Sequence, residues 1–156
     1  MKLEAYIDGG SRGNPGEAGI GVYVPGVVRI AEYLGSSATN NFAEYSALVT
    51  ALRFAVFSRC EELHVFADSE LVVKQINGDY QVRNEGIRPL YDAAQRWIAL
   101  IPRFKISHVR REQNKDADKL ANHAMDTRRT SMKWEPKSSR SSPNEDRVVG
   151  KNSLFD

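Results

Sequence analysis

Residues 3–16 read Leu3-Glu4-Ala5-Tyr6-Ile7-Asp8-Gly9-Gly10-Ser11-Arg12-Gly13-Asn14-Pro15-Gly16. The first five residues are mostly apolar and predict a short strand, Leu3–Ile7, that ends on Asp8. Glycines and a proline then crowd positions 9–16, which is typical of a turn-rich loop. An acid between a strand and such a loop lies where α/β sheets place their functional sites.

Strands and helices alternate along the rest of the chain. Two β-rich runs flank Pro25-Gly26 and predict a hairpin, and a polar loop, Ser36–Asn41, follows them. Apolar periodicity and capping residues then predict these elements: strands Gly19–Val24, Val27–Leu34, Leu63–Ala67 and Phe104–Val109, and helices from Phe42 to about Ser58 (capped by Asn40 or Asn41), Glu70–Ile76 (capped by Ser69), Arg88–Leu100 and Lys115–Met125. The order β-β-β-α-β-α-α-β-α indicates a mixed α/β domain.

Charge and composition divide the chain near residue 126. The 156 residues carry 22 basic and 20 acidic side chains, and this net charge of +2 is too small to indicate a nucleic-acid-binding protein by itself. Residues 1–126 hold 15 basic and 16 acidic side chains, whereas residues 127–156 hold seven and four. Because the last segment is also rich in serine, we expect one domain, 1–126, and a basic, disordered tail, 127–156. The tail is either an inert terminus or a site of non-specific phosphate attraction.

The cysteine content and the apolar runs indicate the compartment. Cys60 is the only cysteine, so no internal disulfide forms and a reducing compartment is expected. No apolar run approaches the roughly 18 residues that span a bilayer, and the N-terminus does not resemble a signal peptide. We therefore expect a cytoplasmic monomer that does not enter a membrane.

Four acids lie at the ends of predicted elements. Asp8 and Asp68 each follow a five-residue strand, whereas Glu44 and Asp118 lie near the starts of helices. Each acid alone is explained as a turn former, a helix cap, a partner of the helix dipole or a surface residue. If the two strands are parallel neighbours, however, Asp8 and Asp68 emerge at one edge of the sheet.

Three or four converging carboxylates need cations to neutralise them. Mg²⁺ is the usual ion for such a set of oxygen ligands, and two ions can stabilise both the attacking and the leaving oxygen of a phosphodiester displacement. The glycine-rich segment lets a sugar-phosphate chain approach the backbone closely, and Thr39-Asn40-Asn41 supplies polar groups nearby. This segment lacks the lysine spacing of a nucleoside-triphosphate loop.

Four segments together resemble type 1 ribonuclease H, the family that cuts the RNA strand of RNA–DNA hybrids. They occur in the family's order within residues 1–125: Tyr6-Ile7-Asp8-Gly9-Gly10-Ser11-Arg12-Gly13-Asn14-Pro15-Gly16, Thr39-Asn40-Asn41-Phe42-Ala43-Glu44, Ala67-Asp68-Ser69 and Asn114-Lys115-Asp116-Ala117-Asp118-Lys119-Leu120-Ala121. The resemblance implies a ribonuclease H-like α/β fold, with a five-stranded mixed sheet of three antiparallel and two parallel strands flanked by helices. It also implies a metal-dependent endonuclease that hydrolyses the RNA strand of a hybrid to 5′-phosphate products. Two Mg²⁺ ions would serve each site, with Mn²⁺ as a possible substitute.

The resemblance also implies roles for individual residues. Asp8, Glu44, Asp68 and Asp118 would be the catalytic, metal-binding carboxylates. Asp8 would lie between the two ions, and Glu44 would also meet the 2′-hydroxyl that distinguishes RNA from DNA. Contacts to the hybrid would come from nine residues: Gly9, Gly10, Arg12, Asn14, Thr39, Asn40, Asn41, Ser69 and Asn114.

The sequence departs from the family pattern in two places. His108 lies inside a predicted strand, two residues before the position of the family's loop histidine, and either Arg110 or Arg111 occupies the vacant region. In addition, no lysine cluster lies between Asp68 and Phe104, so the basic helix that grips the DNA strand in some relatives is missing. Two other functions stay open: a non-catalytic module that binds hybrids or duplexes, and another nuclease of the same fold, such as a junction resolvase or an exonuclease-like enzyme.

Overall fold

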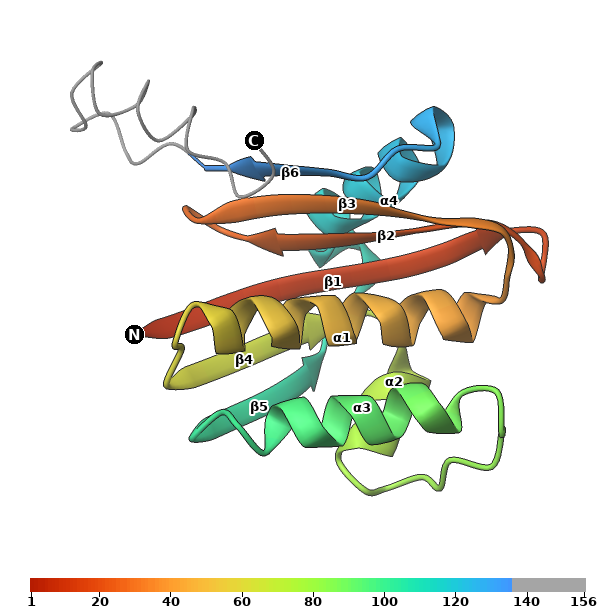
Figure 1. Ribbon diagram of the computed structural model, residues 1–156. Coiled ribbons are helices and arrows are strands. Elements are labelled where there is room, and N and C mark those ends of the chain that lie inside the picture. Colours follow the sequence, from red (N-terminus) through yellow and green to blue (C-terminus); the bar gives the residue numbers. More distant parts are fainter. Residues whose placement is uncertain (136–156) are drawn as a thin grey trace, which may run out of the picture.

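The computed structural model, which describes residues 1–135, contains a mixed sheet of six strands in the order β5-β4-β1-β2-β3-β6 (Figure 1). The strands are β1 (Lys2–Arg12), β2 (Gly16–Val24), β3 (Val28–Ala38), β4 (Glu62–Ala67), β5 (Arg103–His108) and β6 (Ser131–Trp134). Strand β2 pairs antiparallel with both β1 and β3, and β3 pairs antiparallel with β6, whereas β4 pairs in parallel with both β1 and β5. The predicted order of elements is therefore confirmed, with one strand more than expected.

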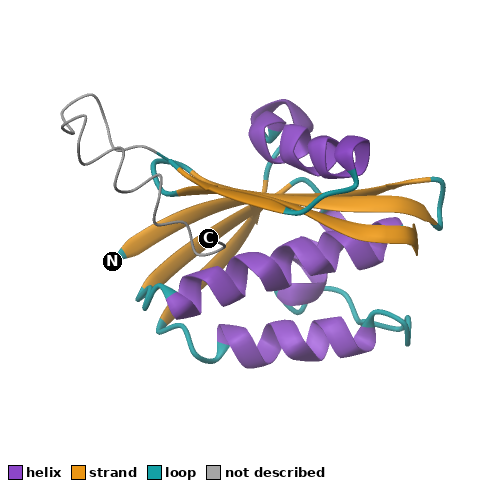
Figure 2. Ribbon diagram, turned by 45° about the horizontal axis from the view of Figure 1, so that its top comes forward, coloured by secondary structure: helices purple, strands orange, loops and turns teal. Residues whose placement is uncertain are grey.

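Helices cover both faces of this sheet (Figure 2). Helices α1 (Asn40–Phe57), α2 (Glu70–Ile76) and α3 (Arg88–Ile98) lie on one face, and α4 (Lys115–Thr127) lies on the other. A short 3-10 helix, η1 (Arg111–Gln113), leads from β5 into α4. The core forms where large side chains of α1, among them Tyr45, Leu48 and Leu52, are completely buried. Among the described residues, none of the helices is both long and apolar enough to cross a lipid bilayer.

The glycine-rich segment is not the loop that its composition predicts. Strand β1 continues through both of its first glycines to residue 12, and it pairs with β2 over that length. Gly9 serves packing instead, because a Cβ atom there would overlap the backbone of Ala43 in α1. Gly21 in β2 has the same role under α4, where a Cβ atom would overlap the carbonyl oxygen of Ala117. The turn begins only at Gly13, whose φ of 93° favours glycine.

The start of α1 also differs from its prediction. Strand β3 extends to Ala38 and α1 begins at Asn40, so the first half of the expected polar loop is strand and its last two residues are helix. Thr39, rather than Asn40 or Asn41, caps the helix, because its Oγ1 accepts a hydrogen bond of 3.1 Å from the backbone N–H of Phe42. The cap predicted for α2 is confirmed, since Ser69 Oγ accepts a hydrogen bond from a backbone N–H of that helix.

The division of the chain at residue 126 is wrong for residues 127–135. Residue 126 lies inside α4, and β6 then pairs with the edge of β3. The ring of Trp134 packs 5.9 Å from that of Phe54. An edge strand offers unpaired backbone groups, and the apolar side chains of β6 gain burial by pairing there. The rest of the expected tail, 136–156, lies outside the described residues.

Candidate active site

The parallel pairing of β1 with β4 brings two of the predicted acids together. Ile7 lies opposite Ala67, the last residue of β4, so Asp8 and Asp68 are the next residues along neighbouring strands. Because β4 ends at Ala67 while β1 continues to Arg12, the edge of β1 that faces β4 is unpaired beyond Ile7. The expectation that these two strands are parallel neighbours is thereby confirmed.

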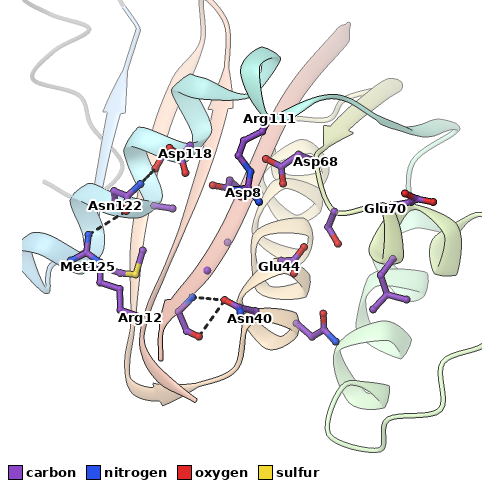
Figure 3. A pocket seen from close by; sticks show the side chains of 17 residues that line it. Asp8, Arg12, Asn40, Glu44, Asp68, Glu70, Arg111, Asp118, Asn122 and Met125 are labelled. Atoms are coloured by element: carbon purple, nitrogen blue, oxygen red, sulfur yellow. Dashed lines mark hydrogen bonds between the residues drawn. The ribbon is translucent and has the colours of Figure 1, made fainter. Parts of the chain in front are cut away.

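All four predicted carboxylates line one open groove of about 560 Å³. Figure 3 shows Asp8 and Asp68 side by side, with Asp118 reaching in from α4 and Glu44 from α1. Helices on opposite faces of the sheet thus each contribute one acid to the groove. The structure therefore brings together residues that are up to 110 positions apart in the sequence.

Burial and mutual repulsion dominate the electrostatics of this groove. Burial, followed by the negative charges of Asp68 and Asp118, raises the pKa of Asp8 from 3.8 to about 8. Burial also raises the pKa of Glu44, although a hydrogen bond from Ser69 and the positive charge of Arg111 act in the opposite direction. The cluster therefore attracts either protons or cations at neutral pH.

The side chains of the groove offer oxygen donors, which suit a hard divalent cation. Carboxylate oxygens are the donors that Mg²⁺ prefers, and four carboxylates line the groove. Among residues 1–135, however, no three acidic, histidine or cysteine side chains are drawn together closely enough to enclose an ion. The carboxylates line a groove rather than surround a point, as expected for groups that repel one another.

Asn114 is buried beneath the groove and holds one of the acids by a hydrogen bond. The residue is only 1% exposed, and its Nδ2 donates hydrogen bonds to the carbonyl of Ile7 (2.8 Å) and to Oδ2 of Asp68 (3.2 Å). Its expected role as a contact to the hybrid is therefore wrong.

The other predicted contacts to a hybrid divide into two groups. Six line the groove: Gly9, Gly10, Arg12, Asn40, Asn41 and Ser69. Asn14 and Thr39 do not: Asn14 Oδ1 accepts a hydrogen bond from the backbone N–H of Asn40, and Thr39 caps α1. Whether any of these residues touches a hybrid stays a prediction.

An arginine of η1, and not the histidine at the end of β5, lines the groove. His108 is the last residue of β5 and is exposed outside the groove, whereas Arg111 lines it from η1. Figure 3 shows the Arg111 side chain reaching toward Asp8 and Asp68. Arg110 does not line the groove, so Arg111 is the one of the two arginines that meets the acids.

Several groove residues were not predicted from the sequence. These are Ser11, Glu70, Leu71, Ala121, Asn122 and Met125. Asn122 and Met125 follow Asp118 by four and seven positions, so helical spacing would have placed them on its face. No pattern in the sequence marks Leu71 as a groove residue, because its position follows from the packing of α2.

Comparison with protein families supports the likeness seen in the motifs. A family model described as reverse transcriptase-like matches residues 7–124. The chain is 39% identical over 129 residues to ribonuclease HI of Halobacterium salinarum, covering 80% of this chain and 65% of that protein. It is 40% identical over 131 residues to a bifunctional protein of Mycobacterium tuberculosis, covering 81% of this chain but only 36% of that protein. The chain thus spans between about one third and two thirds of the length of these relatives.

Solved structures show the same fold. Ribonuclease H1 of Halobacterium salinarum superposes with a TM-score of 0.77 at 36% identity, covering 81% of this chain and 99% of that one. LC11 ribonuclease H1, solved in complex with an RNA/DNA hybrid, gives a TM-score of 0.73 at 35% identity and covers 81% and 98%.

Proposed function

Because the chain belongs to the type 1 ribonuclease H family, we propose that it is a metal-dependent endonuclease that hydrolyses the RNA strand of RNA–DNA hybrids, leaving 5′-phosphates. One observation carries the proposal: four carboxylates from β1, α1, α4 and the end of β4 line one groove. They are Asp8, Glu44, Asp68 and Asp118. A module that only binds nucleic acid has no need for a cluster of acids, because these repel the phosphates that it must hold.

The four acids would hold the divalent ions of this family. Their oxygen donors fit Mg²⁺, and the raised pKa of Asp8 indicates negative charge that cations would stabilise. The chemistry supplied by Mg²⁺ held there would be activation of a water as nucleophile and stabilisation of the charge that develops on the phosphate. The protein holds Asp68 in place through Asn114, whose amide is itself tied to the backbone of β1.

The groove wall next to the acids suits an RNA backbone. The side-chain position of Gly10 is open, since a Cβ atom there would approach only Asn40 Oδ1, at 3.9 Å. A sugar-phosphate chain can therefore come close to the backbone of β1. Glu44 lies on the same side and would accept a hydrogen bond from the 2′-hydroxyl next to the scissile phosphate, which DNA lacks.

Arg111 takes the place of the family's loop histidine in this proposal. A guanidinium attracts a phosphate through its positive charge and its fork of N–H donors, but unlike an imidazole it does not shuttle protons near neutral pH. It would bind the RNA phosphate and assist the departure of the cleaved strand. Arg111→Ala is therefore expected to slow turnover, whereas Arg111→Lys retains part of the rate.

The decisive experiment compares substrates and one matched variant. Labelled RNA–DNA hybrid, duplex RNA, single-stranded RNA and a branched DNA junction are each incubated with the protein in Mg²⁺, in Mn²⁺ and in a chelator. We expect cleavage of the hybrid alone, only with a divalent ion, and a loss of more than about 100-fold in Asp68→Asn. Binding of the hybrid in Mg²⁺ without cleavage would instead identify a binding module, and preferential cleavage of a branched DNA junction would identify a resolvase.

A further inference from the structure

The last residue of β1 is joined to the C-terminal half of α4 by a fork of two contacts. Arg12 Nη1 lies 2.7 Å from Oδ1 of Asp126, and its Nη2 donates a hydrogen bond of 3.2 Å to Oδ1 of Asn122. The Nδ2 of Asn122 in turn donates a hydrogen bond of 3.0 Å to the backbone carbonyl of Asp118. Figure 3 shows this line of contacts running from Arg12 through Asn122 to the turn of α4 that carries Asp118.

The packing of α4 explains why such a fork matters. The helix backbone lies directly on glycines of β2, where a Cβ atom at Gly19 would come within 2.7 Å of the Ala121 carbonyl oxygen. The buried face of α4 is made mainly of alanines, among them Ala117 and Ala124. Small side chains on glycines interlock little, so this contact leaves the helix freer to slide and rotate than large side chains would.

Polar contacts at both ends therefore hold α4 along the sheet. At its start, the side chain of Asn114 binds the carbonyl of Ile7 in β1. At its end, Arg12 binds Asp126 and Asn122. Asp118 lies one turn after the first contact and one turn before Asn122, so its position depends on both.

We propose that Arg12 is a positioning residue, which sets the placement of Asp118 through Asn122 and Asp126 instead of binding a phosphate of the hybrid. Arg12 lines the groove, but both terminal nitrogens of its guanidinium already contact α4. To bind a phosphate it would have to leave two partners, one of them charged. The consequence for cleavage rests on the function proposed above, whereas the consequence for α4 does not.

The test uses variants at both ends of the fork. Arg12→Ala and Asp126→Asn each break the ion pair, Arg12→Lys keeps the charge but loses the fork, and Arg128→Ala is the matched control. Arg128 also pairs with the sheet, at 2.9 Å from Glu17, and its side chain has no link to Asp118. The first two variants are expected to lower kcat for hybrid cleavage about three- to ten-fold and to raise the Mg²⁺ concentration at half-maximal rate, with KM changed less than about two-fold.

Two further results distinguish positioning from substrate contact. The double variant should be no slower than either single one, because both act through the same fork, and Arg12→Lys should recover part of the rate. If Arg12 instead binds a phosphate, Arg12→Ala raises KM and flattens its salt dependence while Asp126→Asn leaves KM unchanged or lowers it. That pattern would overturn the proposal.

Amide hydrogen exchange separates a failure of this inference from a failure of the proposed function. In the protein without metal or hybrid, Arg12→Ala and Asp126→Asn should speed exchange in residues 118–126 more than Arg128→Ala does. If exchange is faster in these variants but the wild type cleaves no hybrid, then Arg12 does position α4 and the proposed function is wrong. If the wild type cleaves hybrid but neither exchange nor kcat changes in the variants, then the positioning role of Arg12 is wrong and the proposed function stands.

Discussion

Helices α1 and α4 each deliver one acid to the same groove, but the sheet holds them in different ways. Helix α1 carries Glu44 and buries large side chains completely, among them Tyr45 and Leu48. Helix α4 carries Asp118, lies on glycines through small side chains, and is fastened by polar contacts at its ends. The position of Glu44 therefore depends on apolar packing. The position of Asp118 depends on close backbone contact and on hydrogen bonds and ion pairs at the ends of α4.

The largest effect is expected from a cavity under α1. Leu48→Ala removes a side chain that is completely buried, and it should lower the free energy of unfolding by about 3–5 kcal/mol. Urea unfolding measures the loss. Because the rest of α1 still holds Glu44, the rate of hybrid cleavage per folded molecule should change less than about three-fold. A much larger loss of rate would mean that α1 is no better anchored than α4.

A smaller loss of stability with a larger loss of activity is expected on the α4 side. Gly21→Ala places a methyl group against the carbonyl of Ala117 and forces α4 away from β2. We expect a loss of about 2–3 kcal/mol in urea unfolding, together with a loss of cleavage rate of more than about ten-fold, because Asp118 moves with the helix. If the rate falls only in proportion to the folded fraction, then the position of Asp118 does not depend on the contact between α4 and β2, and the two helices are not held differently.

Most substitutions of buried residues destabilise a protein, but Asp8→Asn is expected to stabilise this one, because Asp8 is largely buried beside two other acids. The pKa of Asp8 is raised in the folded protein to about 8 from an ordinary 3.8, so its contribution to stability is complete below pH 4 and is lost as the pH rises toward 8. Asparagine does not ionise. Without metal, the variant should therefore be more stable than the wild type, by about 1–2 kcal/mol at pH 9 because water at the groove weakens the repulsion, and by less at pH 5.

Chemical unfolding in a chelator at the two pH values measures this difference. Added Mg²⁺ should reduce it, since the ion stabilises the wild type by binding its folded state. An advantage of Asp8→Asn that is equal at pH 5 and pH 9 would show that the repulsion does not arise from ionisation of Asp8.

The smallest effect is expected where α4 is fastened at the surface. Glu17→Gln removes the ion pair with Arg128, whose side chain is 69% exposed. Such pairs contribute little, so the free energy of unfolding should fall by less than about 1 kcal/mol. The difference from the wild type should shrink further in 0.5 M salt, which is about the concentration that screens exposed charges strongly. A loss that salt does not change would point to the hydrogen bond between Tyr33 and Glu17 instead.

Local patterns in the sequence predicted more of the site than of its supports. Asp8 and Asp68 were found because each follows a short apolar strand, and Ser69 because hydroxyl residues cap helices. Asn114 was assigned to the wrong task, since nothing in its sequence neighbourhood shows that it is buried against Ile7 and Asp68. The role of Arg12 depends on a partner 114 positions away, which spacing along one chain does not reveal.

The sequence by itself determined the order of strands and helices, the four acids and the family, because apolar periodicity, helix caps and contiguous motifs are local properties of the chain. Only the tertiary structure decided that Gly9 serves helix packing instead of a turn, that residues 131–134 add a strand to the sheet, and that Arg111 rather than Arg110 lines the groove with the acids. Each of these features depends on contacts between segments that are distant in the sequence. Such contacts are stabilised by the burial of apolar surface, which local sequence patterns do not reveal.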